Sequence, residues 1–113
     1  MHQPPQLFHR DIRWPNVIRS SDNEDWFLID WEDASAPPTE AAMHMQRVSH
    51  APSVFSDGHG AEVDIWAAGQ LIADAAAEIP SLSLGLRRLG EAMKAGEITT
   101  AEVALDALER LAL

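Results

Sequence analysis

Hydrophobic and polar positions follow two different patterns along the chain, and the first is that of a β-hairpin. Two short apolar runs, at residues 16–18 and 26–29, stand on either side of a segment rich in Asp, Asn and Ser at 20–25. Apolar runs that flank such a segment are typical of two strands and their turn. We therefore predict a hairpin, preceded by a short strand at 7–8 and followed by an irregular loop over 33–50.

The second pattern is helical and begins after Gly60. Residues 61–78 are apolar around most of a helix, which predicts a helix buried in its own protein. Leucines at intervals of four and three predict a second helix over 82–93 that ends near Gly96. A Thr-Thr-Ala-Glu capping box at 99–102 predicts the start of a third helix. That helix is expected to bury four apolar side chains, Val103, Ala107, Leu108 and Leu111. The predicted fold class is mainly α with a short β-hairpin.

Composition narrows the classes of function. The chain has 113 residues with 8 basic and 18 acidic side chains, and each half carries the same excess of acid. An evenly acidic surface repels phosphate backbones, so we expect no binding to nucleic acid. The lack of cysteine excludes disulfides, thiolate zinc sites and a catalytic thiol. The uncharged stretch at 65–73 is far shorter than the roughly 20 residues of a membrane span, so we expect no membrane partner. No signal peptide is readable, so we expect an intracellular location, cytoplasmic or nuclear.

Oxygen-bearing side chains in the first half suit phosphoryl transfer. Asp11 and Asn16 stand five residues apart, and Asp30 follows at the end of the second predicted strand. Phosphoryl transfer needs a carboxylate that orients and deprotonates a hydroxyl, together with oxygen ligands for Mg²⁺ on the phosphates. Asp30 and Asn16 offer hard oxygens of the kind that Mg²⁺ prefers, while waters and nucleotide phosphates complete its shell.

Four segments resemble motifs of eukaryotic protein kinases, in the same order along the chain. Residues 9–16 are similar to the catalytic loop, and Asp-Trp-Glu at 30–32 resembles the metal-binding motif that opens the activation segment. Residues 50–55 resemble the motif that closes that segment, and residues 62–69 resemble the start of the central helix of the C-terminal lobe. The residues of the first two motifs are similar to those of fungal protein kinase-like proteins. The resemblance implies one partial kinase-like domain over 1–113, with a catalytic loop at 9–16, a metal motif and activation segment at 30–53 and C-lobe helices at 61–113.

This resemblance implies a role for each matching residue of the site. Asp11 would be the catalytic base, and Arg13 would face the transferring phosphate. Asn16 and Asp30 would bind Mg²⁺ and, through it, the cofactor ATP.

Supporting roles are implied for three further residues. Arg10 resembles the residue that pairs with a phosphorylated side chain of the activation loop. Asp64 resembles the helix residue that accepts hydrogen bonds from the backbone of His9 and Arg10. We expect His9 to be a buried structural residue, and His44 and His50 to line an exposed loop.

The chain also departs from the kinase pattern. Trp31 stands where Phe is usual, Glu32 replaces Gly, and Ser53 replaces a Glu that pairs with a late Arg in the family. No Gly-rich phosphate loop or phosphate-binding lysine precedes the motifs, and the one lysine of the chain is Lys94. We therefore expect a C-lobe whose N-lobe is supplied by missing upstream sequence, inactive alone.

Three functions remain open. The first is a protein kinase domain that moves the γ-phosphate of ATP to a Ser or Thr hydroxyl of a protein substrate. The second is a small-molecule phosphotransferase of the aminoglycoside or choline kinase type. The segment Ile-Asp-Trp-Glu at 29–32 resembles the metal motif of these enzymes more closely than that of protein kinases. Arg10 and the segments at 51–52 and 64–69, in contrast, favour protein kinases. The third is a non-catalytic interaction module.

An isolated C-lobe should expose the apolar residues that face the N-lobe, near Leu7, Phe8 and Ile29.

Overall fold

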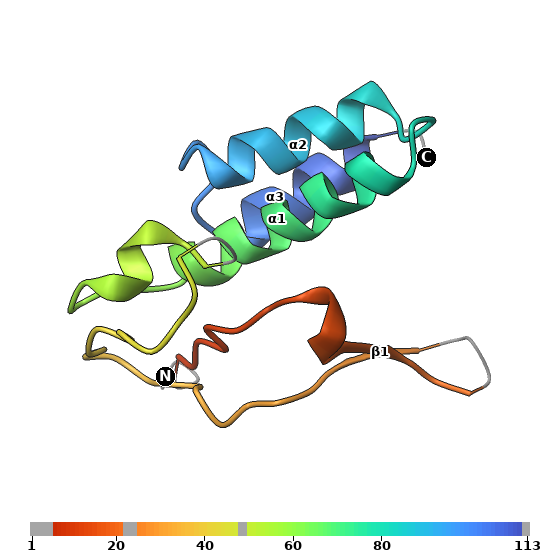
Figure 1. Ribbon diagram of the computed structural model, residues 1–113. Helices are drawn as coiled ribbons and strands as arrows, with labels where there is room; N and C mark the ends of the chain where they lie inside the picture. The colour runs from red at the N-terminus through yellow and green to blue at the C-terminus, as the bar shows by residue number, and fades with distance from the viewer. Residues whose placement is uncertain (1–5, 22–24, 48–49, 112–113) are drawn as a thin grey trace, which may run out of the picture.

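The described part of the protein consists of short irregular segments, one hairpin and three α-helices (Figure 1). The structure is a computed structural model that describes residues 6–21, 25–47 and 50–111. The elements in chain order are η1 (Trp14–Asn16), β1 (Val17–Arg19), β2 (Trp26–Leu28), η2 (Pro52–Phe55), α1 (Glu62–Glu78), α2 (Leu84–Lys94) and α3 (Ala101–Arg110). The predicted class, mainly α with a short hairpin, is confirmed.

The hairpin forms where the apolar runs predict it. Strand β1 pairs with β2 antiparallel, and Val17 lies opposite Leu28. The pairing continues one step inward, because the Ile29 N–H donates to the Asn16 carbonyl at 2.8 Å. The strand predicted at 7–8 is reduced to a single bridge between Phe8 and Ser35. The tip of the predicted turn, at 22–24, lies outside the described residues.

Helices α1 and α2 have the predicted positions and pack at close range. A Cβ built on Gly69 would lie 2.8 Å from the Gly90 carbonyl oxygen, so the two backbones approach as only glycine permits. Ser83 caps the start of α2 by accepting a hydrogen bond from the Leu86 N–H. Gly96 follows its end with φ of +80°, a conformation that favours glycine.

The predicted start of the third helix is wrong by one residue. Its cap is Thr100, whose hydroxyl accepts a hydrogen bond from the Val103 N–H at 3.2 Å, and not Thr99. The burial expected for Val103 and Leu108 is wrong, since both are exposed. The inward packing expected for Ala107 and Leu111 is confirmed, because both pack against the buried residues that α1 and α2 share.

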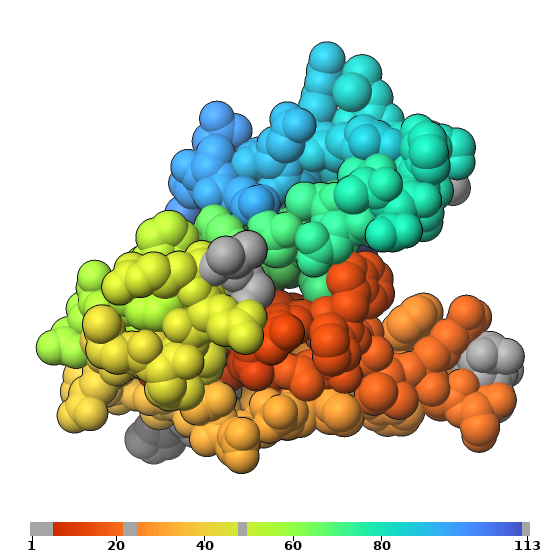
Figure 2. Space-filling view, in the orientation of Figure 1, coloured from red at the N-terminus to blue at the C-terminus, as the bar shows by residue number. Residues whose placement is uncertain are grey.

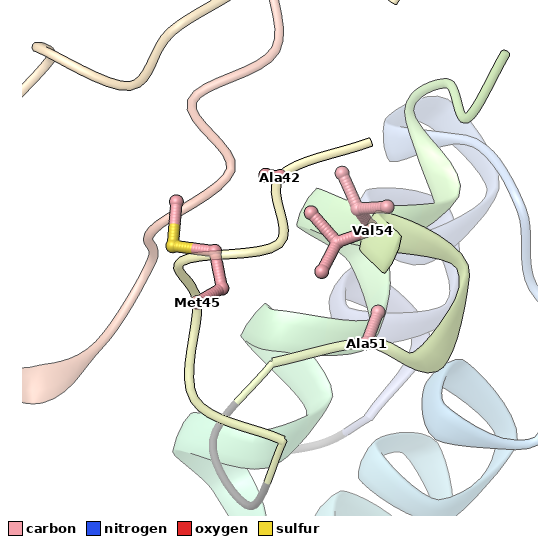
Figure 3. Packing of buried hydrophobic residues seen from close by; sticks show 5 residues of the cluster. Ala42, Met45, Ala51 and Val54 are labelled. Carbon is pink, nitrogen blue, oxygen red and sulfur yellow. The ribbon is translucent and has the colours of Figure 1, made fainter. Parts of the chain in front are cut away.

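Two apolar clusters form the core, and the first joins the irregular segments to the helices. It contains Ala42, Met45, Ala51, Val54 and Val63 and fixes residues 42–45 and 51–54 against the start of α1 (Figure 3). The second contains Ile65, Leu89 and Met93 and lies between α1 and the two later helices. Helix α1 therefore belongs to both clusters, and Figure 2 shows the N-terminal and helical parts as two adjoining masses.

Part of the expected exposed apolar surface is present. Leu7 and Ile29 are exposed, whereas Phe8 is buried, which corrects the expectation for that residue. The bridge to Ser35 explains the burial, because it draws Phe8 inward beneath the segment that leads to α1. Within the described ranges, no helix is long and apolar enough to cross a membrane.

The Gly69–Gly90 contact predicts a stability effect that opposes helix propensity. Gly69→Ala should lower the free energy of unfolding by about 1–2 kcal/mol, because the added methyl group meets backbone and Met93, and this outweighs the gain of roughly 1 kcal/mol in helix propensity. Gly85→Ala in the same pair of helices is the control, since its Cβ would meet only the flexible end of Leu111. Urea denaturation followed by circular dichroism measures both. A Gly69→Ala protein as stable as the parent would contradict the close packing.

Candidate active site

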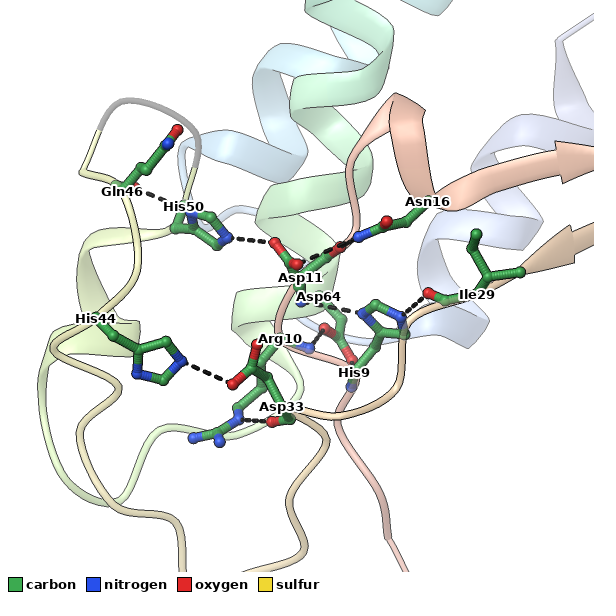
Figure 4. Close-up of polar contacts among 10 residues, drawn as sticks. All are labelled: His9, Arg10, Asp11, Asn16, Ile29, Asp33, His44, Gln46, His50 and Asp64. Carbon is green, nitrogen blue, oxygen red and sulfur yellow. Dashed lines mark hydrogen bonds and ion pairs between the residues drawn. The ribbon is translucent and has the colours of Figure 1, made fainter.

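One carboxylate of α1 holds the start of the segment at 9–16. Asp64 Oδ2 accepts a hydrogen bond from the His9 N–H at 2.8 Å, and its Oδ1 accepts one from the Arg10 N–H at 2.8 Å (Figure 4). These residues are more than fifty positions apart in the chain. Both oxygens of Asp64 are thus used to fix the backbone that leads directly into Asp11.

Burial dominates the electrostatics of Asp64. Removal from water raises the pKa of the Asp64 carboxyl above its ordinary value, and the hydrogen bonds from the Arg10 and His9 N–H groups oppose this rise without cancelling it. The carboxyl is therefore a buried acceptor whose ionisation is costly, and its two backbone donors partly offset this cost.

His9 connects the same segment to the hairpin. Its side chain is 1% exposed, and its Nε2–H donates to the Ile29 carbonyl at 2.8 Å. Nδ1 accepts a hydrogen bond from the Asp11 N–H at 3.0 Å, so the ring carries its proton on Nε2. The edge of Trp31 packs against the imidazole with centroids 4.6 Å apart. His9 therefore has a structural environment, with both nitrogens paired to the backbone.

Asn16 closes the loop around Asp11. Its Nδ2 donates to the Asp11 carbonyl at 2.8 Å and to Asp11 Oδ2 at 3.2 Å. Since both partners are oxygens, the amide orientation is fixed, and the Oδ1 atom of Asn16 is the one left for a cation. The side chain is buried, which keeps this arrangement rigid.

Asp30 is brought beside this loop through its neighbour. The N–H of Ile29 binds the Asn16 carbonyl, and the carbonyl of Ile29 binds His9. Asp30 is exposed and has φ of +62°, and Arg10 has φ of +70°, while every other described residue with positive φ is glycine. Such backbone costs about 1–3 kcal/mol per residue and is concentrated at functional sites. Both residues border the candidate site.

The two arginines differ in their surroundings. Arg10 donates from Nε to the Asp33 carbonyl at 2.6 Å and from Nη1 to the Glu40 carbonyl at 3.2 Å and to His59 Nε2 at 3.3 Å. It therefore already binds the segment at 33–40 without a phosphate. Arg13 precedes η1 and, within the described ranges, its guanidinium has no hydrogen-bond or ion-pair partner.

His50 was missed by the sequence analysis. The expectation that it lines an exposed loop is wrong, because its side chain is 4% exposed and its Nε2 lies 2.7 Å from Asp11 Oδ1. It stands 39 residues from Asp11, and no periodic pattern marks it. Its sequence signal was its place at the start of the kinase-like segment at 50–55, directly before Ala51, which packs in the first cluster. His44, in contrast, is exposed and lies 2.7 Å from Asp33.

Metal ligands are sparse at the site. Across residues 6–21, 25–47 and 50–111, no group of three or more His, Asp or Glu side chains has the geometry to hold a metal ion.

Comparison with known proteins finds a match over part of the chain. No protein-family profile matches the chain, and no solved structure matches it. The chain is similar to a curated protein named Crinkler effector protein 8 from Phytophthora infestans, with 44% identity over 68 residues that cover 57% of this chain. The match covers 11% of that protein, so this chain spans about a tenth of its relative.

Removing the negative carboxylate of Asp64 should destabilise the protein. Asp64→Asn places an amide NH₂ opposite one of the two backbone N–H groups, and a buried donor without an acceptor costs about 1–3 kcal/mol of unfolding free energy. Asp74→Asn, an exposed change in the same helix, is the matched control and should have little effect. Urea denaturation at neutral pH measures the difference. Equal stability of Asp64→Asn and the parent would contradict this role.

The raised pKa of Asp64 also predicts a pH dependence with a definite sign. The folded protein keeps this proton at pH values where the unfolded chain, with a carboxyl value of about 3.9, has lost it. The stability that this carboxyl contributes is present below that value and is lost as the pH rises through the raised pKa. The stability difference between the parent and Asp64→Asn should therefore shrink across that range. A difference that widens with pH would contradict the raised pKa.

Proposed function

We propose that this chain is the C-terminal-lobe part of a protein kinase-type phosphotransferase, which moves the γ-phosphate of ATP to a Ser or Thr hydroxyl of a protein. The observation that supports it most is the pair of hydrogen bonds that the backbone N–H groups of His9 and Arg10 donate to Asp64. These bonds orient a loop in which a carboxylate, an amide oxygen and the neighbouring end of a hairpin meet. Such a set suits a hydroxyl acceptor and a metal-bound phosphate.

Asp11 acts on the acceptor hydroxyl in this proposal. Its side chain is 14% exposed, so one edge of the carboxylate is accessible to a substrate. Its carboxylate can accept a hydrogen bond from the hydroxyl, orient the oxygen toward the phosphorus and take the proton as the new bond forms. Arg13, whose guanidinium has no partner among the described side chains, supplies positive charge for the transferring phosphate.

Asn16 and Asp30 would hold the metal that accompanies ATP. The Oδ1 atom of Asn16 and the exposed carboxylate of Asp30 are hard oxygen donors, and Mg²⁺ completes its shell with waters and phosphate oxygens. When bound with the nucleotide, Mg²⁺ would neutralise part of the negative charge on the phosphates. Two protein oxygens would hold it only weakly by themselves, so the phosphates of the nucleotide would have to supply further ligands.

The nucleotide itself needs a second lobe in this proposal. The one lysine, Lys94, lies in α2 with its ammonium 4.9 Å from the ring centre of Trp66, so it is not at the site. Leu7, Ile29 and Trp31 are exposed beside the loop and offer an apolar surface on which such a lobe can pack.

A second candidate is a non-catalytic interaction module. The position of Lys94 favours it, because the chain brings no lysine of its own to the phosphates. The name of the similar protein, an effector, is compatible with either candidate. Activity measurements separate the two.

The role of Asp11 predicts a loss of turnover. In a hybrid that joins residues 1–113 to a protein kinase N-lobe, Asp11→Ala should lower kcat about 10²–10⁴-fold, the usual contribution of a general base, with nucleotide affinity little changed. Asp74→Ala is the control, since Asp74 is exposed on α1 and binds only Gln70. Transfer of ³²P to a protein substrate measures kcat. Equal turnover of Asp11→Ala and the parent hybrid would reject Asp11 as the base.

The metal assignment predicts a loss that depends on Mg²⁺. Residues 1–113 alone should bind Mg²⁺·ATP weakly, and the hybrid should bind it clearly. Asp30→Asn should weaken binding of Mg²⁺·ATP to the hybrid and leave metal-free ATP binding intact, because only the metal contact is lost. Asp25→Asn, an exposed change in the same hairpin, is the control. Calorimetry with and without Mg²⁺ measures both, and unchanged binding by Asp30→Asn would refute the assignment.

A further inference from the structure

The carboxylate of Asp11 has a second partner that the kinase-like motifs do not explain. Asn16 holds Oδ2 from within the same loop, whereas His50 approaches Oδ1 at 2.7 Å from 39 residues away (Figure 4). The imidazole is 4% exposed, so water does not compete freely for this contact. Asp11 is thereby joined to the segment that enters η2.

The surroundings of His50 determine which group donates. Its Nδ1 lies 2.9 Å from the Gln46 carbonyl, which can only accept, so Nδ1 carries a proton. Its Nε2 faces a carboxylate oxygen, which also accepts when ionised. In the bond between the two side chains, Nε2–H of His50 is therefore the donor and Oδ1 of Asp11 is the acceptor.

A second buried histidine offers an internal comparison. His59 also has Nδ1 against a carbonyl, that of Ser56 at 2.8 Å, but its Nε2 faces the Arg10 guanidinium at 3.3 Å. A guanidinium only donates, so His59 Nε2 accepts there. The two rings thus have the same kind of contact at Nδ1 and differ at Nε2, where His50 faces a carboxylate and His59 faces a guanidinium.

We propose that His50 is the positioning residue of Asp11: by donating Nε2–H to Oδ1, it fixes the carboxylate so that its accessible edge faces the acceptor hydroxyl. This role rests on the proposed function of Asp11. The anchor of His50 is firm, because the adjacent Ala51 and nearby Val54 are buried in the first cluster. Misplacement of a reacting group by about 1 Å can cost on the order of 10²-fold in rate, so a carboxylate free to rotate would be a poor base.

The bond itself can be read from the nitrogen resonances of the imidazoles. In residues 1–113 labelled with ¹⁵N-histidine, Nε2 of His50 should carry a proton and Nε2 of His59 should not. In Asp11→Asn the amide donates to Nε2 of His50, which should then lose its proton, while Nε2 of His59 stays unchanged. A His50 Nε2 without a proton in the parent, or with a proton in Asp11→Asn, would overturn the proposal.

The positioning role is tested by turnover in the hybrid with the N-lobe. His50→Leu removes the donor and should lower kcat about 10²-fold with nucleotide KM unchanged. His50→Gln keeps an N–H near the place of Nε2 and should restore most of this loss, which separates positioning from mere packing. Equal kcat for His50→Leu and the parent, or equal losses for both variants, would overturn the proposal. A parent hybrid that transfers no phosphate would instead overturn the proposed function, so the two failures are seen in different measurements.

Discussion

The candidate site depends on the carboxylate of Asp64, which accepts backbone hydrogen bonds that a helix or strand would otherwise accept. The segment at 9–13 belongs to no strand or helix, so its backbone N–H groups need other acceptors. Asp64 provides them for His9 and Arg10, and the positive φ of Arg10 is the kind of backbone that turns successive N–H groups toward one anion. Asp64 lies in α1, which contributes residues to both apolar clusters. The two hydrogen bonds therefore fix the loop to the core.

Two chains of contacts lead from the loop that Asp64 holds to the residues that carry the proposed chemistry. One runs from His9 to the Ile29 carbonyl and so to Asp30 at the end of the hairpin. The other runs from Asn16 through Asp11 to His50. In each case a local hydrogen bond within the loop is matched by one to a distant segment, so the geometry at Asp11 is set by long-range contacts.

The sequence predicted the parts of this structure that rest on local patterns. The apolar runs around a polar turn identified the hairpin, and the apolar periodicity placed α1 and α2. The predicted start of α3 was wrong by one residue, since two adjacent threonines each offer a cap and Thr100 is the one that accepts from the Val103 N–H. The burial of His50 and Phe8 followed no local rule, because each is fixed by a partner far along the chain. The resemblance to kinases predicted that Asp64 accepts hydrogen bonds from the backbone of His9 and Arg10, a contact that periodicity and spacing do not predict.

Residue-resolved amide hydrogen exchange of the 113-residue chain tests the central claim most directly. If Asp64 fixes the loop to the helix, the amides of His9 and Arg10 should exchange as slowly as those of Ile65 and Ala67 in the buried part of α1, although they lie outside any helix or strand. The amide of Met43, an exposed turn residue whose N–H has no acceptor among the described residues, should exchange much faster and serves as the reference for an unprotected backbone. Exchange of His9 and Arg10 at the rate of that reference would contradict the account.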